Sequence, residues 1–311
     1  MPPFTLLVRL RRLVVVAALT SVPVGVAAFE VTTEREPLRD VGPLVGLARL
    51  TVEGPADVGG LSAVIWDGPG RVLFASDRGR LFTAAVVRDE AGALAGLVDW
   101  TDHRPPYRGG RGDLEGLAVS AGQLLISVEV PPHVLRFAGP LARPERLVSY
   151  FTRDDLGFAH NAGFEALVDL PGEDWLAVAE TRAADGTHLA FTRARERLRY
   201  RAAADFAPTG ADRLGRRLFF VERRVSLLGG WQARLTCVDV AAVTPGAVLE
   251  PVELARLGFA DGVDNMEGIA VRADGADLEL LVVSDDNQAP FQRTVVLHYR
   301  WPEAASGGCR P

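Results

Sequence analysis

Runs of consecutive apolar residues that end on an acidic residue recur along this chain. Five such runs occur, and their last residues are Asp77, Glu129, Glu180, Glu222 and Asp285. These acids lie 52, 51, 42 and 63 residues apart, with a mean spacing of 52. That spacing is typical of one four-stranded blade of a β-propeller.

A second short run with strand composition precedes four of the five acid-ending runs. The copies are residues 60–64, 114–119, 164–168 and 266–271, whereas the fourth copy along the chain, Gly210-Ala211-Asp212, is degenerate. Two such runs joined by a turn-like stretch predict an antiparallel hairpin. Because both runs are apolar on consecutive residues, we expect inner strands that neighbouring blades cover on both faces.

Outer strands are expected where the composition is more polar, at residues 80–87, 134–137, 234–240 and 294–300. Five repeats fill most of residues 29–311, so we predict an all-β fold with a single β-propeller domain of five four-stranded blades. Residues 44–52 are predicted to add a strand to the last blade and close the ring. The long interval from Glu222 to Asp285 leaves a sixth, degenerate blade as an alternative.

The first 28 residues have a different character from the rest. Three arginines between positions 9 and 12 precede a 16-residue apolar stretch, and Val26-Ala27-Ala28 offers small residues before Phe29. This pattern predicts a signal peptide over residues 1–28 and a periplasmic or secreted protein, and it favours the Sec type. Arg11-Arg12 also raises the twin-arginine route, which the residues around the pair support poorly. A membrane anchor would need about 20 unbroken apolar residues, and Pro23 interrupts this stretch.

Composition removes several classes of function. All 34 basic residues are Arg, which excludes Schiff-base and P-loop lysines. With 40 acids the net charge is −6, which disfavours a nucleic-acid partner. The two cysteines, Cys237 and Cys309, form one disulfide in an oxidising compartment or stay as unrelated thiols; the sequence leaves both open.

Hairpin geometry brings many acids to one place. The start of the first strand and the end of the second lie at the same end of a hairpin, so nine carboxylates are expected around one mouth of the propeller. They are Asp77, Glu115, Glu129, Glu165, Glu180, Glu222, Glu267, Asp285 and Asp286. Their repulsion needs raised pKa values, arginines or a hard cation, and calcium is the candidate cofactor. The alternative for any one acid is a hydrogen-bonded tie between blades.

Specific roles follow from these positions. The predicted metal ligands are Asp77, Glu129, Glu180, Glu222, Glu267, Asp285 and Asp286. The predicted catalytic residues are Glu115, Glu165, Glu267, Arg78, Arg293 and His160. Arginine presents a fork that suits a phosphate or carboxylate of a small anionic or ester substrate, and a histidine is a candidate general acid or base.

Several motifs, taken in order, resemble an exported bacterial family described as "esterase-like activity of phytase". They are Ser76-Asp77-Arg78-Gly79, Asp113-Leu114-Glu115-Gly116, Asn161-Ala162-Gly163-Phe164-Glu165, Asp264-Asn265-Met266-Glu267-Gly268, Ser284-Asp285-Asp286-Asn287 and Gln292-Arg293-Thr294. The resemblance runs from about residue 45 to 300. It implies a propeller hydrolase of ester or phosphoester bonds with calcium at the mouth. Ala166 departs from the pattern, which usually has glycine there.

Three functions therefore compete on the sequence. The first is a calcium-dependent phosphoester hydrolase. The second is a non-catalytic exported propeller that binds a ligand or partner, with the acids as blade ties. The third is a propeller lactonase or carboxylesterase in which one metal polarises a carbonyl.

Overall fold

The computed structural model describes residues 30–55, 58–105, 112–129, 132–138, 141, 145–150, 163–302 and 309, the stretch 145–150 in its backbone only. The predicted signal peptide and His160 lie outside these residues. Within them the chain forms strands and two short 3-10 helices, η2 (Val240–Ala242) and η3 (Phe259–Asp261), and no α-helix. No helix in this part of the chain is long and apolar enough to cross a membrane.

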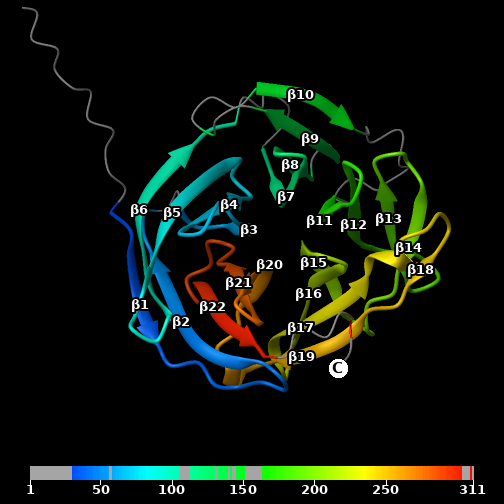
Figure 1. The fold of residues 1–311 in the computed structure, drawn as a ribbon. Helices are drawn as coiled ribbons and strands as arrows, with labels where there is room; N and C mark the ends of the chain where they lie inside the picture. Colours follow the sequence, from blue (N-terminus) through cyan, green and yellow to red (C-terminus); the bar gives the residue numbers. More distant parts are fainter. Residues whose placement is uncertain are drawn as a thin grey trace, which may run out of the picture.

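Five sheets surround one axis, each a blade numbered here by its order along the chain (Figure 1). Blade 1 contains β3 (Leu61–Trp66), β4 (Arg71–Ser76), β5 (Arg80–Arg88) and β6 (Leu94–His103). Blade 2 contains β7 (Leu114–Ser120), β8 (Gln123–Val128), β9 (His133–Ala138) and β10 (Glu145–Tyr150). Blade 3 contains β11 (Phe164–Leu170), β12 (Asp174–Arg182), β13 (His188–Thr192), β14 (Arg197–Tyr200) and β18 (Val248–Leu249).

The last two blades complete the ring. Blade 4 contains β15 (Ala207–Leu214), β16 (Arg217–Ser226), β17 (Gly230–Asp239) and β19 (Val252–Leu257). Blade 5 contains β20 (Asn265–Asp274), β21 (Asp277–Asp285), β22 (Thr294–Trp301), β2 (Val45–Glu53) and β1 (Thr32–Glu36). The prediction of a five-bladed propeller is confirmed.

The ring closes through the N-terminal strand, as predicted. Strand β2 pairs antiparallel with β22, from Val45 opposite Arg300 to Val52 opposite Thr294, and β1 covers the outer edge of β2. In Figure 1 the blue strand β2 lies beside the red strand β22. The first and last strands of the described chain therefore belong to the same blade, and the sheet edge that β22 would expose is paired.

Blade 4 corrects the reading of the degenerate copy. The segment around Gly210 forms the full strand β15, which pairs with β16 along its length. The long interval that left room for a sixth blade instead holds β17, β19 and the short β18, which crosses to blade 3 and pairs parallel with β14. The extra length links two blades, because β18 lies in the connection between β17 and β19 of blade 4 but adds a strand to the sheet of blade 3.

The hydrophobic core lies between blades. The described buried residues form five clusters, each shared by two adjacent blades; Phe74 of β4 and Val283 of β21, for example, belong to one cluster. Every inner strand is thus covered on both faces, which explains why β4 and β21 are apolar on consecutive residues.

A disulfide between Cys237 and Cys309 ties the C-terminal tail to β17, with 5.5 Å between the two Cα atoms. The bond closes a sequence interval of 72 residues. We expect the double variant Cys237→Ser, Cys309→Ser to lose roughly 4 kcal/mol of unfolding free energy, because the unfolded chain gains the entropy of the open loop. Urea denaturation measures the loss, and reduced wild-type protein is the matched control. A stability equal to that of the oxidised protein would contradict the expectation.

Candidate functional site

The first strand of each blade has a β-bulge at the same place. These innermost strands are β3, β7, β11, β15 and β20. Their pairing with the second strand skips one residue near the start of each, and these five residues are Ser62, Glu115, Glu165, Thr209 and Glu267. All five are at most 7% exposed. A bulge re-aims the side chain of the extra residue, so one buried polar side chain per blade is set at the axis end of the sheet. We call these five residues the bulge ring.

The two hydroxyl members of the bulge ring tie neighbouring blades together. Ser62 donates to the carbonyl oxygen of Leu114 at 2.5 Å, and Thr209 donates to that of Met266 at 3.0 Å. Each acceptor precedes the bulge residue of the next blade. The tie role considered for the acids is thus carried by hydroxyls in blades 1 and 4, while blades 2, 3 and 5 place glutamates at the same position.

A second ring follows from the ends of the second strands. In each blade, one residue at the end of the second strand lies opposite the residue two positions before the bulge residue. These residues are Asp77, Glu129, Glu180, Arg223 and Asp285. We call these five the rim residues. Four are the acids that end the repeated runs, so the structure brings together Asp77, Glu129, Glu180 and Asp285 with the glutamates of the bulge ring. The electrostatic coupling of Asp77 to Asp285 and of Glu129 to Glu180 crosses blade boundaries.

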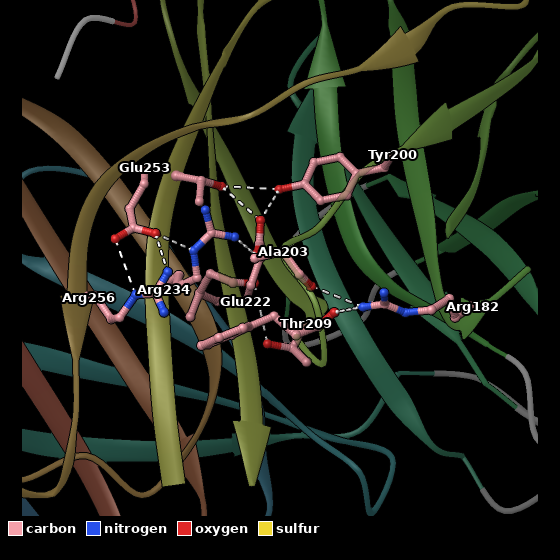
Figure 2. Close-up of polar contacts among 11 residues, drawn as sticks. Arg182, Tyr200, Ala203, Thr209, Glu222, Arg234, Glu253 and Arg256 are labelled. Carbon is pink, nitrogen blue, oxygen red and sulfur yellow. Dashed lines mark hydrogen bonds and ion pairs between the residues drawn. The ribbon is translucent and has the colours of Figure 1, made fainter. Parts of the chain in front are cut away.

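Glu222 does not join this assembly. Its register partner on β15 is Pro208, whereas Arg223 pairs with Ala207 at the rim position, so the acid-ending run of blade 4 stops one residue short of the rim. A shift of one residue sends a strand side chain to the opposite face. Figure 2 shows Glu222 between Tyr200, which donates at 2.8 Å, and Arg234, at 2.5 Å. The expectation of Glu222 at the mouth is therefore corrected; it lies buried between blades 3 and 4.

Small residues make room for the rim acids. Gly60 has a φ of +71°, and a Cβ at this position would lie 2.0 Å from Oδ1 of Asp77. Asp77 in turn donates its backbone N–H to the carbonyl oxygen of Gly60 at 3.0 Å. Glycine is needed here both for the left-handed backbone and for the close approach of the carboxylate.

Burial and mutual repulsion raise the pKa values of the carboxyls at the mouth. Burial comes first as the cause in every case, and it raises the pKa of Asp77 and Glu129 to about 7, of Glu267 to about 8 and of Asp285 to about 6. The pKa of Glu115 is raised well above its usual range by burial and by the charge of Glu165. The mouth thus holds more carboxyl groups than cationic side chains to neutralise them.

Arg223 is the cation at the centre of this set. Its Nη2 lies 3.1 Å from Oε1 of Glu180 and 3.4 Å from Oε1 of Glu267, and its Nη1 donates to Oδ1 of Asn265 at 2.5 Å. Asn265 also donates to Oε1 of Glu267 at 2.6 Å. The guanidinium of Arg223 and the amide of Asn265 thus provide the donors for the carboxylates of Glu180 and Glu267, on the side of the mouth that blades 3 to 5 form.

The opposite side, in blade 2, has the donor set for a cation. Oxygens of Asp113, Glu115 and Glu129 all lie within 4.8 Å of one another. Three carboxylates at this separation fit a hard cation such as calcium, which takes oxygen ligands in flexible geometry. Asp113 was not among the predicted ligands, although it stands directly before Leu114-Glu115 in the quoted motif.

A cleft opens beside the mouth, between blades 5 and 1. It has a volume of about 610 Å³, and its lining includes Arg78, Asp286, Gln292 and Arg293. Asp286 accepts the backbone N–H of Gly60 at 3.1 Å, which ties the cleft wall to the rim. The predicted residues Arg78, Arg293 and Asp286 therefore share one cleft, adjacent to the carboxylates rather than among them.

Below the bulge ring the axis is closed. Gly116, Leu167, Gly210 and Gly268 line a space in which a water molecule does not fit. Among the described residues, the mouth acids therefore lie on one side of this closed section of the axis.

Comparisons with known proteins agree with the motifs. A sequence model of the phytase-like family described as "Esterase-like activity of phytase" matches residues 56–288. No curated protein matches the chain.

Solved structures with similar folds include a glutaminyl cyclase from Myxococcus xanthus, at 12% identity and a TM-score of 0.45, covering 85% of this chain and 98% of that one. An α-L-arabinofuranosidase from Clostridium thermocellum has 9% identity and a TM-score of 0.46, with 71% and 80% covered. An aldose sugar dehydrogenase from Streptomyces coelicolor has 11% identity and a TM-score of 0.43, with 86% and 98% covered.

Proposed function

Because the chain belongs to the phytase-like family described as "Esterase-like activity of phytase", we propose that it is an exported hydrolase of phosphoester or carboxylic ester bonds that uses a calcium-type cation. The observation that carries the proposal is the Asp113, Glu115 and Glu129 oxygen cluster in a mouth whose rim also borders a cleft lined by Arg78 and Arg293. Calcium at this cluster would act as a Lewis acid on the substrate oxygen and lower the pKa of a bound water.

The protein's own groups have separable roles in this proposal. Arg78 and Arg293 bind the anionic group of the substrate in the cleft, where a guanidinium fork suits a phosphate. The charges of Asp113 and Asp285 both act on Asp77, and the next residue in the chain, Arg78, lines the cleft. Because burial raises its pKa to about 7, Asp77 is suited to take a proton from an attacking water near neutral pH.

Export is part of the proposal. The Cys237–Cys309 bond supports it, because disulfides persist in oxidising compartments and are rare in the cytosol. The pattern of residues 1–28 supports it independently.

The test is an assay of aryl phosphates, aryl acetates and lactones with calcium or with chelator. We expect turnover of at least one class only with calcium, and we expect Glu115→Gln to lower kcat/KM by about 100-fold or more. Glu222→Gln is the matched control, because it lies outside the mouth and the amide keeps an acceptor for Tyr200; its activity should match the wild type once circular dichroism shows a folded protein. Calcium-dependent thermal stabilisation without turnover of any substrate would contradict hydrolysis and leave a binding propeller.

A further inference from the structure

The most exposed large apolar side chains of the described chain all lie on the mouth face, in blades 4 and 5. They are Val225, Leu227, Leu228, Phe259 and Phe291, at 63%, 106%, 104%, 86% and 84% exposure. The other exposed large hydrophobic residues are less than half exposed. Exposed apolar groups concentrated on one face mark an interaction surface.

Topology fixes these residues to that face. Strand β16 passes the rim at Arg223 and continues to Ser226, which pairs with Gly230, so Leu227 and Leu228 form the tip of a hairpin that projects beyond the rim. Phe291 lies between Asp285 and β22, in the connection on the same side. Phe259 follows β19, whose last residue, Leu257, pairs with Ala233 at the level of Arg223.

Guanidinium groups accompany the apolar tips. Arg224, at the base of the hairpin, lies 4.8 Å from the ring centre of Phe206 and donates to Oε1 of Gln232. Arg256 lies 5.3 Å from the same ring, and its side chain is 46% exposed. Arg182 reaches the carbonyl oxygens of Ala203 and Phe206, as Figure 2 shows.

The charge balance of this cluster is positive. Among the described contacts Arg256 is paired with Glu253, whereas those of Arg182 and Arg224 go to uncharged oxygens. The glutamates of the bulge ring are at most 7% exposed. The rim acid Glu180 is more open, with a side chain that is 39% exposed, but it is paired with Arg223.

We propose that this face docks on an anionic phospholipid bilayer, with Leu227 and Leu228 inserted among the acyl chains and Arg182 and Arg224 on lipid phosphates. Side chains that are fully exposed at a hairpin tip have no neighbours to preorganise them, which suits a fluid phase better than a close-packed protein interface. Arginine forks bind phosphate well. Docking would direct the mouth toward the bilayer, because the hairpin adjoins the rim: the ring centre of Trp231 in the hairpin lies 5.9 Å from Cζ of the rim residue Arg223.

The experiment is sedimentation of the mature protein with vesicles of phosphatidylcholine alone or with 30% phosphatidylglycerol, in chelator so that neither calcium bridging nor metal-dependent hydrolysis contributes. We expect binding to the anionic vesicles, weakened at least tenfold in the double variant Leu227→Asn, Leu228→Asn. The control is Val119→Asn. Val119 is 48% exposed and lies beside the turn between β7 and β8, at the end of β7 that is away from the mouth. Arg224→Gln should weaken the preference for phosphatidylglycerol.

Three results would overturn the docking proposal. The first is absence of vesicle binding, and the second is an equal loss of binding in the Val119→Asn control. The third is wild-type dimerisation that the leucine variant abolishes without any vesicle binding, which would make the face a contact between copies of this chain. Because the assay needs no turnover, its failure leaves the hydrolase proposal intact.

Discussion

Replacing Arg223 by glutamine should lower the free energy of unfolding by about 2–4 kcal/mol at pH 8 in the presence of chelator. Arg223 is the cation that contacts Glu180 and Glu267. It lowers the pKa of Glu267, although burial outweighs this effect and the pKa is about 8. Without it, charged carboxylates face one another at the mouth. The side chain of Arg223 is 20% exposed, so the expected cost is below that of a fully buried pair.

The effect should depend on pH with a definite sign. Acids whose pKa is raised in the folded state bind more protons there than in the unfolded chain, so stability falls as pH rises from about 4 to about 8. Asp77, Glu129 and Glu267 are mostly protonated at pH 5, and Arg223→Gln should cost much less there than at pH 8. Urea denaturation at both pH values measures this.

Arg224→Gln is the matched control for Arg223→Gln, because the neighbouring guanidinium hydrogen-bonds to Gln232 and not to the mouth acids. It should show no comparable pH dependence. An Arg223→Gln cost that is equal at pH 5 and pH 8 would contradict the role of Arg223 as counter-ion to the carboxylates.

Gly210→Ala should cost about 3 kcal/mol or more, or prevent folding. A Cβ at this position would lie 2.1 Å from the carbonyl oxygen of Glu267 and 3.1 Å from the Cα of Gly268. Both are backbone atoms, so no side chain can rotate away, and inner strands β15 and β20 would have to separate. The loss would reach the bulge ring directly, because Glu267 itself is displaced.

The control for Gly210→Ala is Gly70→Ala, where nothing lies within 4 Å of the added carbon. Denaturation midpoints of the two variants measure the difference. Equal stability of both would mean that the inner strands do not approach as closely as this geometry requires.

Much of the fold could be predicted from the sequence, because the repeat length of the apolar runs corresponds to one blade of the propeller. One blade uses about 52 residues, and the apolar runs of β4 and β21 reflect burial on both faces. The closing role of β2 followed from the same reasoning, since an unpaired strand edge is costly. The eroded blade 4 was harder, because β15 carries Thr209 where three other blades carry glutamate.

The site was predictable in composition more than in detail. Rim acids such as Asp77 and Asp285 sit where the end of a strand must place them. Glu222 was placed wrongly because a run that ends on an acid does not reveal its register, and one residue decides the face. Asp113 precedes β7 and Asn265 is the first residue of β20, so the period of apolar runs gave no signal for either. Their neighbours at the mouth become evident only when the blades are brought together.

The pairing of β2 with β22 has a consequence for biogenesis. Synthesis proceeds at roughly 5–20 residues per second, so the strand at 45–53 waits on the order of 10–50 seconds before residues 294–301 exist to pair with it. During that interval one edge of β2 is open to wrong partners. Strand β1 folds back on the other edge, and its charged residues Glu34, Arg35 and Glu36 discourage further addition. Pairing of β1 with β2 thus leaves one edge of β2, and not two, for the last strand to cover.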